Sequence, residues 1–508
     1  MSQAEGPAPG PDFTAGVPLV SIPPGGVLAG RVGDDAVLLA RLDDGSVHAV
    51  AAHCTHYGGP LAEGLVEGDE IRCPWHHACF SLRTGRARHA PAFAPLAKWR
   101  VDTVGDTVFV RGRDTTPPPA RTRPGADPRR IVIVGGGAAG YAAALRLREL
   151  GHDGSITMLS ADDAPPCDRP NLSKDYLAGT APEDWIPLQP RGFYADRGID
   201  LHLGCKVARI DTKAREATTL AGDAFGYDAL LLATGAEPRR LNIPGADLPN
   251  VFTLRTLADA RAIIAAALRA KSVAFVGAGF IGLEAAAALR MRGLDVHVVA
   301  PETVPMERVL GRELGDLFAD LHRRNGVSLH LGATPASFDG HVLGLDNGTR
   351  LLADLLVVGT GVTPRTALAS AAGLQVDIGI VVDSRLQTSV AGHYAAGDVA
   401  RYPHAGELVR VEHWVHAQRQ GQAVAANMLG ADRAFTDVPF FWTHQYDLEL
   451  RYTGQGAWDD MRIDGSLAAC DFTARYFRGG RLVAAASCGR DLENLQVEAQ
   501  LAGQESGR

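Results

Sequence analysis

Residues 131–140 read IVIVGGGAAG, and YAAALRLREL follows them. The first four residues are apolar and β-branched, a short run typical of a buried strand in a parallel sheet. Gly135, Gly137 and Gly140 then form the pattern G-x-G-x-x-G, and the alanine- and leucine-rich segment after them predicts a helix. The first glycine permits a tight turn, the second lets a pyrophosphate approach the backbone, and the third lets the helix pack on the strand.

The residues that follow fit the same motif. Ala138 and Ala139 open the helix, whose N-terminal N–H groups can bind phosphate oxygens. A second apolar run, SITML, comes next, and Asp162 stands where an acid would accept hydrogen bonds from a ribose hydroxyl. A glycine pattern alone would equally fit a surface loop. The order strand, helix, strand and acid therefore predicts a dinucleotide-binding domain.

The chain repeats this pattern further on. Residues 272–293 read SVAFVGAGFIGLEAAAALRMRG, again a strand, a glycine turn and a helix. The residues of this turn that we expect to contact a second nucleotide are Gly277, Gly279, Ile281 and Gly282. Two such motifs in one chain are typical of a flavoprotein that takes hydride from a nicotinamide cofactor.

The N-terminal part of the chain has a different character. Short alternating runs such as VLAGRV and AVLLARL, broken by Gly and Asp turns, predict a small all-β domain. Inside it stand Cys54-Thr55-His56 and Cys73-Pro74-Trp75-His76. Two Cys-and-His pairs on two loops could bind zinc or an iron–sulfur cluster. Zinc ribbons usually use C-x-x-C pairs, whereas these pairs are C-x-H and C-x-x-H.

The segments CTHYGG and CPWHHACF resemble the two cluster-binding loops of the Rieske fold. The resemblance implies that Cys54 and Cys73 hold one iron of a [2Fe-2S] cluster and that His56 and His76 hold the other. Neutral imidazoles in place of two thiolates raise the reduction potential above that of an all-cysteine cluster. Outside the ligand pattern, we expect His53 and His77 to be solvated and Cys79 to be a small buried side chain.

Two departures set this domain apart from high-potential Rieske proteins. Those proteins carry an extra cysteine in each loop, joined as a disulfide, where this chain has Gly59 and Trp75. They also place a hydroxyl near the cluster sulfurs, where this chain has Ala78. Fewer hydrogen bonds to sulfur lower the potential. We therefore predict a low-potential, ferredoxin-like centre, below about 0 mV in a redox titration.

The central part of the chain, from residue 131 to about residue 454, resembles the pyridine-nucleotide-dependent ferredoxin reductases in PPCDRPNLSKDYL, LLATGAEPRR and AGHYAAGDVA. The resemblance implies FAD and a nicotinamide nucleotide as cofactors. It implies that FAD is lined by Arg169, Lys174, Ala233, Thr234, Gly235 and Asp398, with Asp398 on the ribityl chain and Val207 contacting adenine through its backbone. Gly361 would face the nicotinamide, and Trp414 is either near the isoalloxazine or a core aromatic.

The resemblance also implies a charged pair at the hydride-transfer site. Glu284 lies in GFIGLE, and on a surface helix it would simply be solvated. By resemblance it reaches Lys174, and a buried pair is tolerable because each charge has a partner. These two residues are the candidate catalytic groups. Glu302, just beyond the strand DVHVVA, would accept the ribose hydroxyls and repel a 2′-phosphate, so NADH is favoured over NADPH.

A dithiol relay, as in disulfide reductases, is not predicted. Only Cys167 lies near the first nucleotide motif, with no partner close in sequence. It stands where relatives commonly have tyrosine, so we interpret it as a substitution rather than a nucleophile. The aromatic residues Phe440, Phe441, Trp442 and Tyr446 are expected in core or interface packing.

The predicted fold is multidomain, with two Rossmann-like α/β nucleotide-binding domains, the second inserted in the first. The expected parts are an all-β Rieske domain at residues 16–113, a linker at 114–128, an FAD domain at 129–248 and 376–432, an NAD domain at 249–375, and a C-terminal α+β interface domain at 433–500. The linker is rich in Pro and Arg and would be semi-rigid.

Composition excludes several classes of function. The net charge of −8 argues against a general nucleic-acid binder. No apolar run reaches membrane-spanning length, and the N-terminus lacks the order of a signal peptide. Seven cysteines scattered over 508 residues do not suit a disulfide scaffold. We therefore expect a cytoplasmic protein.

The combination of domains resembles apoptosis-inducing-factor-like proteins with an N-terminal Rieske domain and, more broadly, the reductase components of oxygenases. The implied function is an NAD(P)H-dependent reductase, passing electrons from NADH through FAD to or from the cluster. A ferredoxin, an oxygenase component or a cytochrome would be the external partner, and the C-terminal domain would form a homodimer. Two alternatives stay open: an NADH oxidase or quinone-type reductase acting at the flavin, and an NADH-responsive redox-signalling flavoprotein.

Overall fold

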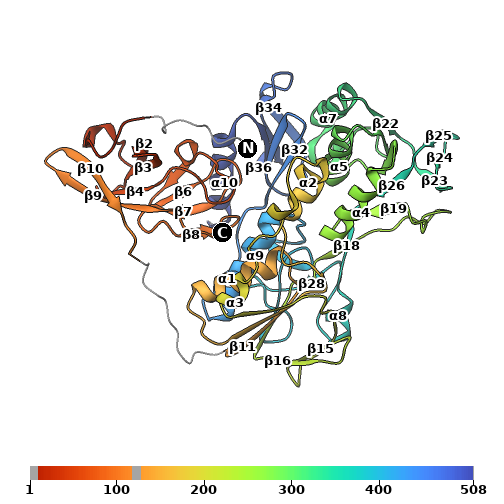
Figure 1. The fold of residues 1–508 in the computed structure, drawn as a ribbon, viewed down its shortest axis with the longest axis horizontal. Coiled ribbons are helices and arrows are strands. Elements are labelled where there is room, and N and C mark those ends of the chain that lie inside the picture. The colour runs from red at the N-terminus through yellow and green to blue at the C-terminus, as the bar shows by residue number, and fades with distance from the viewer. Residues whose placement is uncertain (1–9, 117–127, 507–508) are drawn as a thin grey trace. The chain divides into compact units, whose positions relative to one another are not determined.

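The computed structural model describes residues 10–116 and 128–506, and the described chain folds into two compact units (Figure 1). The first unit comprises residues 10–116, 149–151 and 490–506, and the second comprises residues 128–148 and 152–489. Most of the predicted linker, residues 117–127, lies outside the described residues. The boundaries proposed for the individual domains stay predictions.

The first unit is built on a six-stranded antiparallel sheet. Its strands are β1 (Val17–Pro18), β2 (Gly26–Val32), β3 (Asp35–Arg41), β4 (Val47–Ala51), β9 (Lys98–Val104) and β10 (Thr107–Arg113), in the spatial order β1-β10-β9-β4-β3-β2. Strand β3 is buried on both faces, because successive side chains of a strand point to opposite sides. Leu38 and Ala40 enter one core, and Val37 and Leu39 enter another.

A smaller antiparallel sheet completes the β structure of residues 10–116 and confirms the all-β character of this N-terminal part. Its strands are β5 (Leu65–Glu67), β6 (Glu70–Arg72), β7 (Cys79–Ser81) and β8 (Ala87–His89). The 3₁₀ helices η1 (Leu19–Ser21) and η2 (Leu61–Glu63) connect strands. The last helix of the chain, α10 (Asp491–Ser506), belongs to this unit, next to β5 (Figure 1).

The first nucleotide motif forms a parallel sheet in the second unit. Its strands are β11 (Arg130–Val134), β12 (Ser155–Leu159), β13 (Ile199–His202), β17 (Ala229–Leu232) and β29 (His393–Ala395), in the order β13-β12-β11-β17-β29. Helix α1 (Ala138–Glu149) follows β11, and α9 (Trp414–Met428) comes after the last strand. Leu230 of β17 pairs with His393 of β29, so the last strand of this sheet comes after the inserted domain in the sequence. The predicted insertion is confirmed.

The inserted domain has its own five-stranded parallel sheet. Its strands are β19 (Val251–Thr253), β20 (Ser272–Val276), β21 (Asp295–Ala300), β22 (Val327–Leu331) and β26 (Leu355–Val358), in the order β19-β26-β20-β21-β22. Its main helices are α4 (Leu257–Ala267), α5 (Phe280–Met291) and α7 (Arg312–Arg324). Helix α4 begins with a capping box, in which Thr256 accepts from the backbone of Asp259 and the Asp259 side chain accepts from the backbone of Thr256.

The two nucleotide domains also contain short sheets and helices. The strands are β14 (Val207–Asp211), β15 (Glu216–Thr219), β16 (Ala224–Gly226), β18 (Ala236–Pro238), β23 (Pro335–Phe338), β24 (Val342–Leu345), β25 (Arg350–Leu352), β27 (Val362–Pro364), β28 (Ile380–Val381), β30 (Ala400–His404) and β31 (Glu407–Val409). The helices are η3 (Arg169–Ser173), α2 (Asp175–Ala178), η4 (Glu183–Trp185), α3 (Phe193–Asp196), α6 (Glu307–Leu310) and α8 (Ala367–Ala371). Strand β18 pairs with β27, which joins the chain entering the inserted domain to the chain leaving it.

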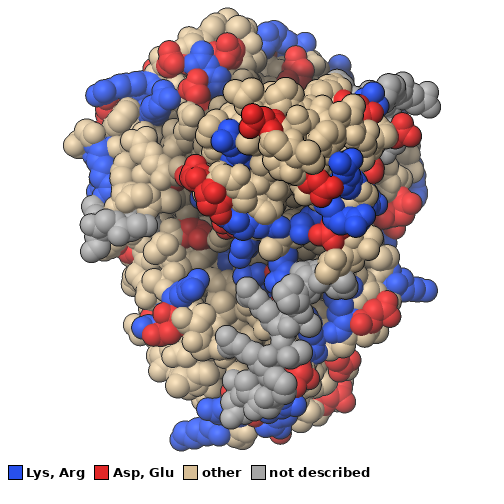
Figure 2. Space-filling model, turned by 90° about the vertical axis from the view of Figure 1, so that its left-hand side faces the viewer, with Lys and Arg blue, Asp and Glu red and all other residues tan. Residues whose placement is uncertain are grey.

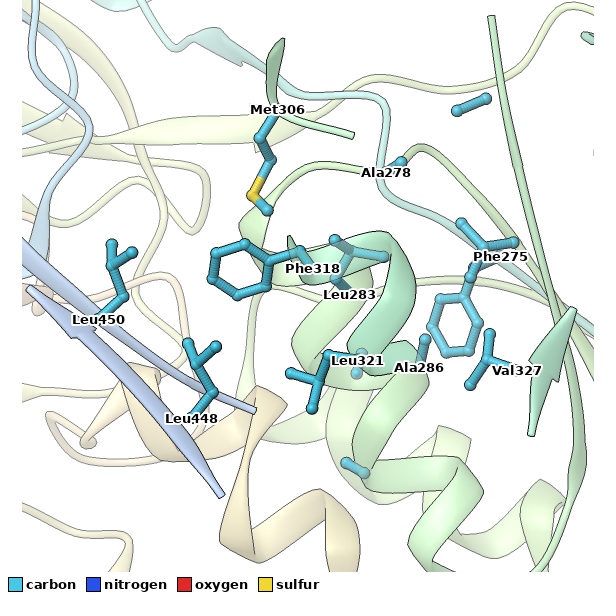
Figure 3. Close-up of a cluster of buried hydrophobic side chains, with 14 of the residues drawn as sticks. Phe275, Ala278, Leu283, Ala286, Met306, Phe318, Leu321, Val327, Leu448 and Leu450 are labelled. Carbon is cyan, nitrogen blue, oxygen red and sulfur yellow. The ribbon is translucent and has the colours of Figure 1, made fainter. Parts of the chain in front are cut away.

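The C-terminal sheet shares a hydrophobic core with the inserted domain. Its strands are β32 (Phe440–Gln445), β33 (Leu448–Gly454), β34 (Asp460–Ser466), β35 (Asp471–Arg478) and β36 (Arg481–Cys488), antiparallel in the order β32-β33-β36-β35-β34. Leu448 and Leu450 of β33 point toward Phe318 and Leu321 of α7 (Figure 3). Each buried leucine contributes about 1.5–3 kcal/mol, so this sheet holds β32 firmly against the nucleotide domains.

The surface carries both signs of charge. Figure 2 shows both basic and acidic side chains on the face that it draws. Within residues 10–116 and 128–506, no helix is long and apolar enough to span a membrane.

Candidate functional site

A cavity of about 1750 Å³ opens in the second unit. It lies at the carboxyl ends of β11 and β20, the place where parallel α/β sheets bind ligands. Its wall includes these residues expected from the sequence: Gly135, Gly137, Ala138, Ala139, Asp162, Arg169, Lys174, Val207, Ala233, Thr234, Gly235, Gly277, Gly279, Ile281, Gly282, Glu284, Glu302, Gly361, Asp398 and Trp414. Gly140 does not line the cavity, because it packs behind the turn.

The first and third glycines of each pattern are required by close packing. Gly135 has φ +118°, and a Cβ there would lie 2.2 Å from the carbonyl oxygen of Ala233. Gly277 of the second pattern has the same geometry. Its φ is +111°, and a Cβ there would lie 2.4 Å from the carbonyl oxygen of Gly359. At Gly140 a Cβ would lie 2.0 Å from the carbonyl oxygen of Gly135. No side chain fits at these positions.

The second glycine of each pattern faces the cavity instead. A Cβ at Gly279 would meet nothing within 4 Å, and at Gly137 it would meet only the Arg169 guanidinium, at 3.9 Å. The backbone is therefore open on the side where a diphosphate would approach. With a helix N-terminus below and a guanidinium above, the residues around Gly137 fit an anionic dinucleotide.

Two arginine–carboxylate pairs lie in the wall of the cavity. Arg169 donates to Asp162 at 2.9 Å, and Arg255 forms an ion pair with Asp398. Burial, together with the neighbouring Arg255 guanidinium, lowers the pKa of Arg169. Arg410 adds a hydrogen bond of 3.0 Å to the carbonyl oxygen of Asp398. Arg255 was not expected from the sequence, because it precedes α4 and lies 143 residues from its partner.

The predicted lysine–glutamate pair forms. The Lys174 Nζ lies 2.8 Å from an oxygen of Glu284, whose residue is only 5% exposed. Ser173 and Thr443 also donate hydroxyl hydrogen bonds to this carboxylate, at 2.6 and 2.7 Å. The carboxylate thus has three donors, which is what a buried anion needs. Thr443 comes from β32, and no sequence signal pointed to it.

Strand β32 also places aromatic rings in the cavity wall. Phe441 packs against the hydrophobic core, as expected, and also lines the cavity. Trp442 was expected in core or interface packing, yet it lines the cavity. The Phe441 ring lies edge-on to Phe280 at 4.7 Å between centroids, and Lys174 Nζ lies 5.9 Å from the Trp442 ring centroid. Trp414 lines the same cavity, and its place near the isoalloxazine stays a prediction. These rings provide an apolar, stacking surface beside the charged pair.

Cys167 has the environment of a structural thiol. Its Sγ donates to the carbonyl oxygen of Pro165 at 2.9 Å, and burial raises its pKa to about 11. A thiol is nucleophilic as its thiolate, so this environment disfavours reactivity. Cys167 does not line the large cavity.

In the first unit, two tight loops bring the candidate cluster ligands together. In one loop, the backbone N–H of Cys54 donates to Gly59, and in the other that of Cys73 donates to Ala78, at 2.9 and 2.8 Å. The Cys54 and Cys73 thiols are hydrogen-bonded to each other. The imidazoles of His56 and His76 lie 5.0 Å apart between ring centroids.

This arrangement of two thiols and two imidazoles fits a dinuclear cluster. Within the described residues no group of three or more His, Cys, Asp or Glu side chains surrounds a single ion position. A dinuclear Rieske cluster needs only two protein ligands at each iron. Burial lowers the pKa of His56 to about 3, so its imidazole is neutral, as a metal ligand must be.

Around the two loops, the structure confirms some of the environments expected from the sequence and contradicts one of them. A Cβ at Gly59 would lie 3.1 Å from the Trp75 ring, so the two positions that carry a disulfide in high-potential relatives face each other here without one. His53 is exposed, as expected. His77, expected to be solvated, is 1% exposed and contacts Glu498 of α10. Cys79 is buried and donates to Glu70 at 3.0 Å.

Comparison with known protein families identifies three segments of the chain. The family model described as pyridine nucleotide-disulphide oxidoreductase matches residues 129–421, the Rieske [2Fe-2S] domain matches residues 17–100, and the reductase C-terminal domain matches residues 440–506. Human apoptosis-inducing factor 3 is 34% identical over 483 residues, covering 91% of this chain and 79% of that protein. The chain belongs to the pyridine nucleotide-disulphide oxidoreductase family.

Other members of the family resemble the flavin part alone. Rhodocoxin reductase of Rhodococcus erythropolis is 38% identical over 380 residues, covering 73% of this chain and 89% of that protein. The structure of a covalent complex of putidaredoxin reductase with putidaredoxin aligns with a TM-score of 0.71 at 34% identity, covering 74% of this chain and 93% of that one.

Membership of the family determines the cofactors and the class of reaction. The chain is an FAD-dependent oxidoreductase of the ferredoxin-reductase type, and its Rieske domain holds a [2Fe-2S] cluster. It transfers electrons from NAD(P)H through FAD to a redox partner. The glycine turns and the paired loops described above fit these groups.

Proposed function

We propose that this chain is an NADH-dependent reductase that exchanges electrons between FAD, its own Rieske cluster and a small external redox protein. The observation that carries the proposal is that both glycine turns open into one cavity of about 1750 Å³. Two nucleotides bound at these turns would extend into the same space, which direct hydride transfer requires. When bound, the flavin accepts an electron pair from the nicotinamide and delivers single electrons, which is what an iron–sulfur cluster can take up.

We assign three tasks to the residues of the cavity. The backbone at Gly137 and the guanidinium of Arg169 would bind the FAD diphosphate. Lys174, held by Glu284, would orient the nicotinamide and the flavin toward each other. Trp442 would cover this site and exclude water.

We propose Cys54 and Cys73 as ligands of one iron and His56 and His76 as ligands of the other. Support comes from their convergence on two adjacent loops and from the neutral state that burial imposes on His56. The absence of a disulfide at Gly59 and Trp75 supports a low-potential centre.

NADH is the proposed hydride donor. Glu302 lines the cavity beyond β21, where its carboxylate would accept ribose hydroxyls and repel the 2′-phosphate of NADPH. Arg308 lies in the same wall and would attract that phosphate. We expect the preference for NADH to rest on the balance of these two charges.

The proposed external partner is a small redox protein: a ferredoxin, an oxygenase component or a cytochrome. The named relatives include a putidaredoxin reductase solved in complex with putidaredoxin, which supports a partner of this kind. We also propose a cytoplasmic location, because all seven cysteines are described and no disulfide joins any two of them. Dimerisation through the C-terminal domain stays a prediction, which sedimentation would test.

Anaerobic stopped-flow reduction by NADH tests the proposal, with flavin and cluster absorbance followed separately. We expect fast flavin bleaching followed by cluster reduction. A cluster that stays oxidised during turnover would instead indicate an oxidase or quinone-type reductase acting at the flavin. Very slow reduction with a long-lived charge-transfer complex would indicate a redox-signalling protein.

A further inference from the structure

The last helix of the chain carries a buried carboxylate in the first unit. Glu498 of α10 is 3% exposed. A buried carboxylate is stable only when it is paired and hydrogen-bonded. Its Oε2 lies 2.6 Å from His77 Nδ1 and 3.6 Å from Arg72 Nη1. Because an ionised carboxylate can only accept, the His77 Nδ1 donates the hydrogen bond.

The two partners of Glu498 bracket one of the candidate cluster loops. Arg72 is the last residue of β6 and directly precedes Cys73, and His77 directly follows His76. One carboxylate therefore contacts the residues on both sides of the segment 73–76, which carries two of the four candidate ligands. The contact joins residues 421 positions apart in the chain.

His77 has a backbone conformation that needs support. Its φ is +60°, a left-handed conformation that is uncommon for residues other than glycine. Its backbone N–H donates to the carbonyl oxygen of Cys73 at 3.1 Å, which closes the turn around the ligands. The buried contact between the His77 ring and Glu498 holds the side chain of this strained residue.

We propose that Glu498 is a positioning residue for the Rieske cluster. By accepting from His77 and pairing with Arg72, it fixes the loop that presents Cys73 and His76. Retention of the cluster and the uniformity of its surroundings would then depend on the last helix of the chain. This inference rests on the proposed ligand assignment, since only then does the segment 73–76 hold iron.

The test compares Glu498→Ala with Glu498→Gln in the full-length protein loaded with FAD and cluster. The readouts are the rate of cluster bleaching with an iron chelator and the EPR spectrum of the reduced cluster. We expect Glu498→Ala to bleach about tenfold faster, with broadened EPR features. Glu498→Gln keeps an oxygen that accepts from His77, so it should stay within about twofold of the parent.

Two further variants separate positioning from general loss of stability. Gln496 is exposed on the same helix, so Gln496→Ala should leave bleaching and EPR unchanged. His77→Asn removes the imidazole but keeps a residue that tolerates a positive φ. It should bleach like Glu498→Ala, and the double variant should be no faster than the faster single variant.

The outcomes distinguish this proposal from the ligand assignment. Parent-like bleaching and EPR in Glu498→Ala would overturn the positioning role, and so would additive effects of Glu498→Ala and His77→Asn. Equal damage from the Gln and Ala variants would also overturn it. A Cys54→Ser variant that keeps a full cluster would overturn the ligand assignment instead. Reduction of a dye by NADH should be unchanged in every Glu498 variant, because Glu498 is not among the residues lining the flavin cavity.

Discussion

Removing the charge of Glu284 should slow flavin reduction and also destabilise the fold. The Lys174 Nζ lies 2.8 Å from the carboxylate, and the two side chains are 12% and 4% exposed. At an effective dielectric constant of about 20, two unit charges at this distance attract by about 6 kcal/mol before desolvation is subtracted. The hydroxyl hydrogen bonds from Ser173 and Thr443 contribute about 1.5–3 kcal/mol each, because they reach a charged group. Removing one partner of a buried pair typically costs about 3–5 kcal/mol, because the other charge is left uncompensated.

Two substitutions separate the loss of the Glu284 charge from the loss of its hydrogen-bond acceptor and volume. Glu284→Gln keeps the volume and an acceptor for the hydroxyls but leaves the Lys174 ammonium without its counter-charge. Glu284→Ala also removes the acceptor and opens a cavity, so it should lower the free energy of unfolding by about 3–5 kcal/mol, more than Gln does. Both variants release Lys174 from its position. We expect NADH to reduce the flavin ten- to a hundredfold more slowly in each, about 1.4–2.7 kcal/mol in activation free energy.

Anaerobic stopped-flow measurement of flavin absorbance at saturating NADH gives this rate, and thermal unfolding gives the stability. The matched control is Thr443→Val, which removes one hydrogen bond to the same carboxylate without removing a charge. It should cost about 1.5–3 kcal/mol of stability and change the rate less than threefold. If Glu284→Gln reduces flavin within twofold of the parent rate, the pair has no role in hydride transfer and the reasoning is wrong.

Three further expectations follow from the site and the core. Cys54→Ser should lose cluster iron but keep NADH-to-dye activity; loss of both would show that the flavin site depends on the cluster. Glu302→Gln should raise kcat/KM for NADPH relative to NADH about fivefold, roughly 1 kcal/mol, and Arg308→Gln should move the ratio the other way; an unchanged ratio in both refutes the assignment. Burial lowers the pKa of His322, whose Nε2 lies 2.8 Å from Gln445. Below about pH 6.5 the unfolded state therefore binds more protons, and stability should fall by up to about 1.4 kcal/mol per pH unit for this histidine. His322→Gln should flatten that slope in unfolding curves measured from pH 7.5 to 5; an unchanged slope would contradict it.

The parts of the site that the sequence predicted are those encoded by neighbouring residues. A glycine turn needs only the strand before it and the helix after it, so Gly135 and Gly277 could be recognised from their surroundings. The cluster loops were equally local, because each carries one cysteine and one histidine within four residues. The insertion of one nucleotide domain in the other followed from the order of the two glycine patterns, and the pairing of β17 with β29 confirms it.

The parts that sequence reasoning missed are contributions from distant segments. Trp442 resembled a core aromatic, because alternation along β32 does not say which face meets a cavity. Arg255 stands in a helix-capping segment of the inserted domain, with no local pattern that marks it as a partner of Asp398. His77 resembled a solvated loop residue, because α10, which supplies Glu498, begins more than 400 residues later.

Three buried carboxylates have their basic partners far away in the sequence. Glu284, Asp398 and Glu498 pair with basic side chains that lie 110, 143 and 421 residues away in the chain. A buried charge needs a partner, and each of these three acids has one on another element. Each of these acids therefore joins distant segments next to a proposed cofactor site. An acid inside a mostly apolar helix, such as Glu284 in FIGLEAAAALRM, therefore predicts a basic partner on a distant segment. Identifying that partner is the first step toward the function of the acid.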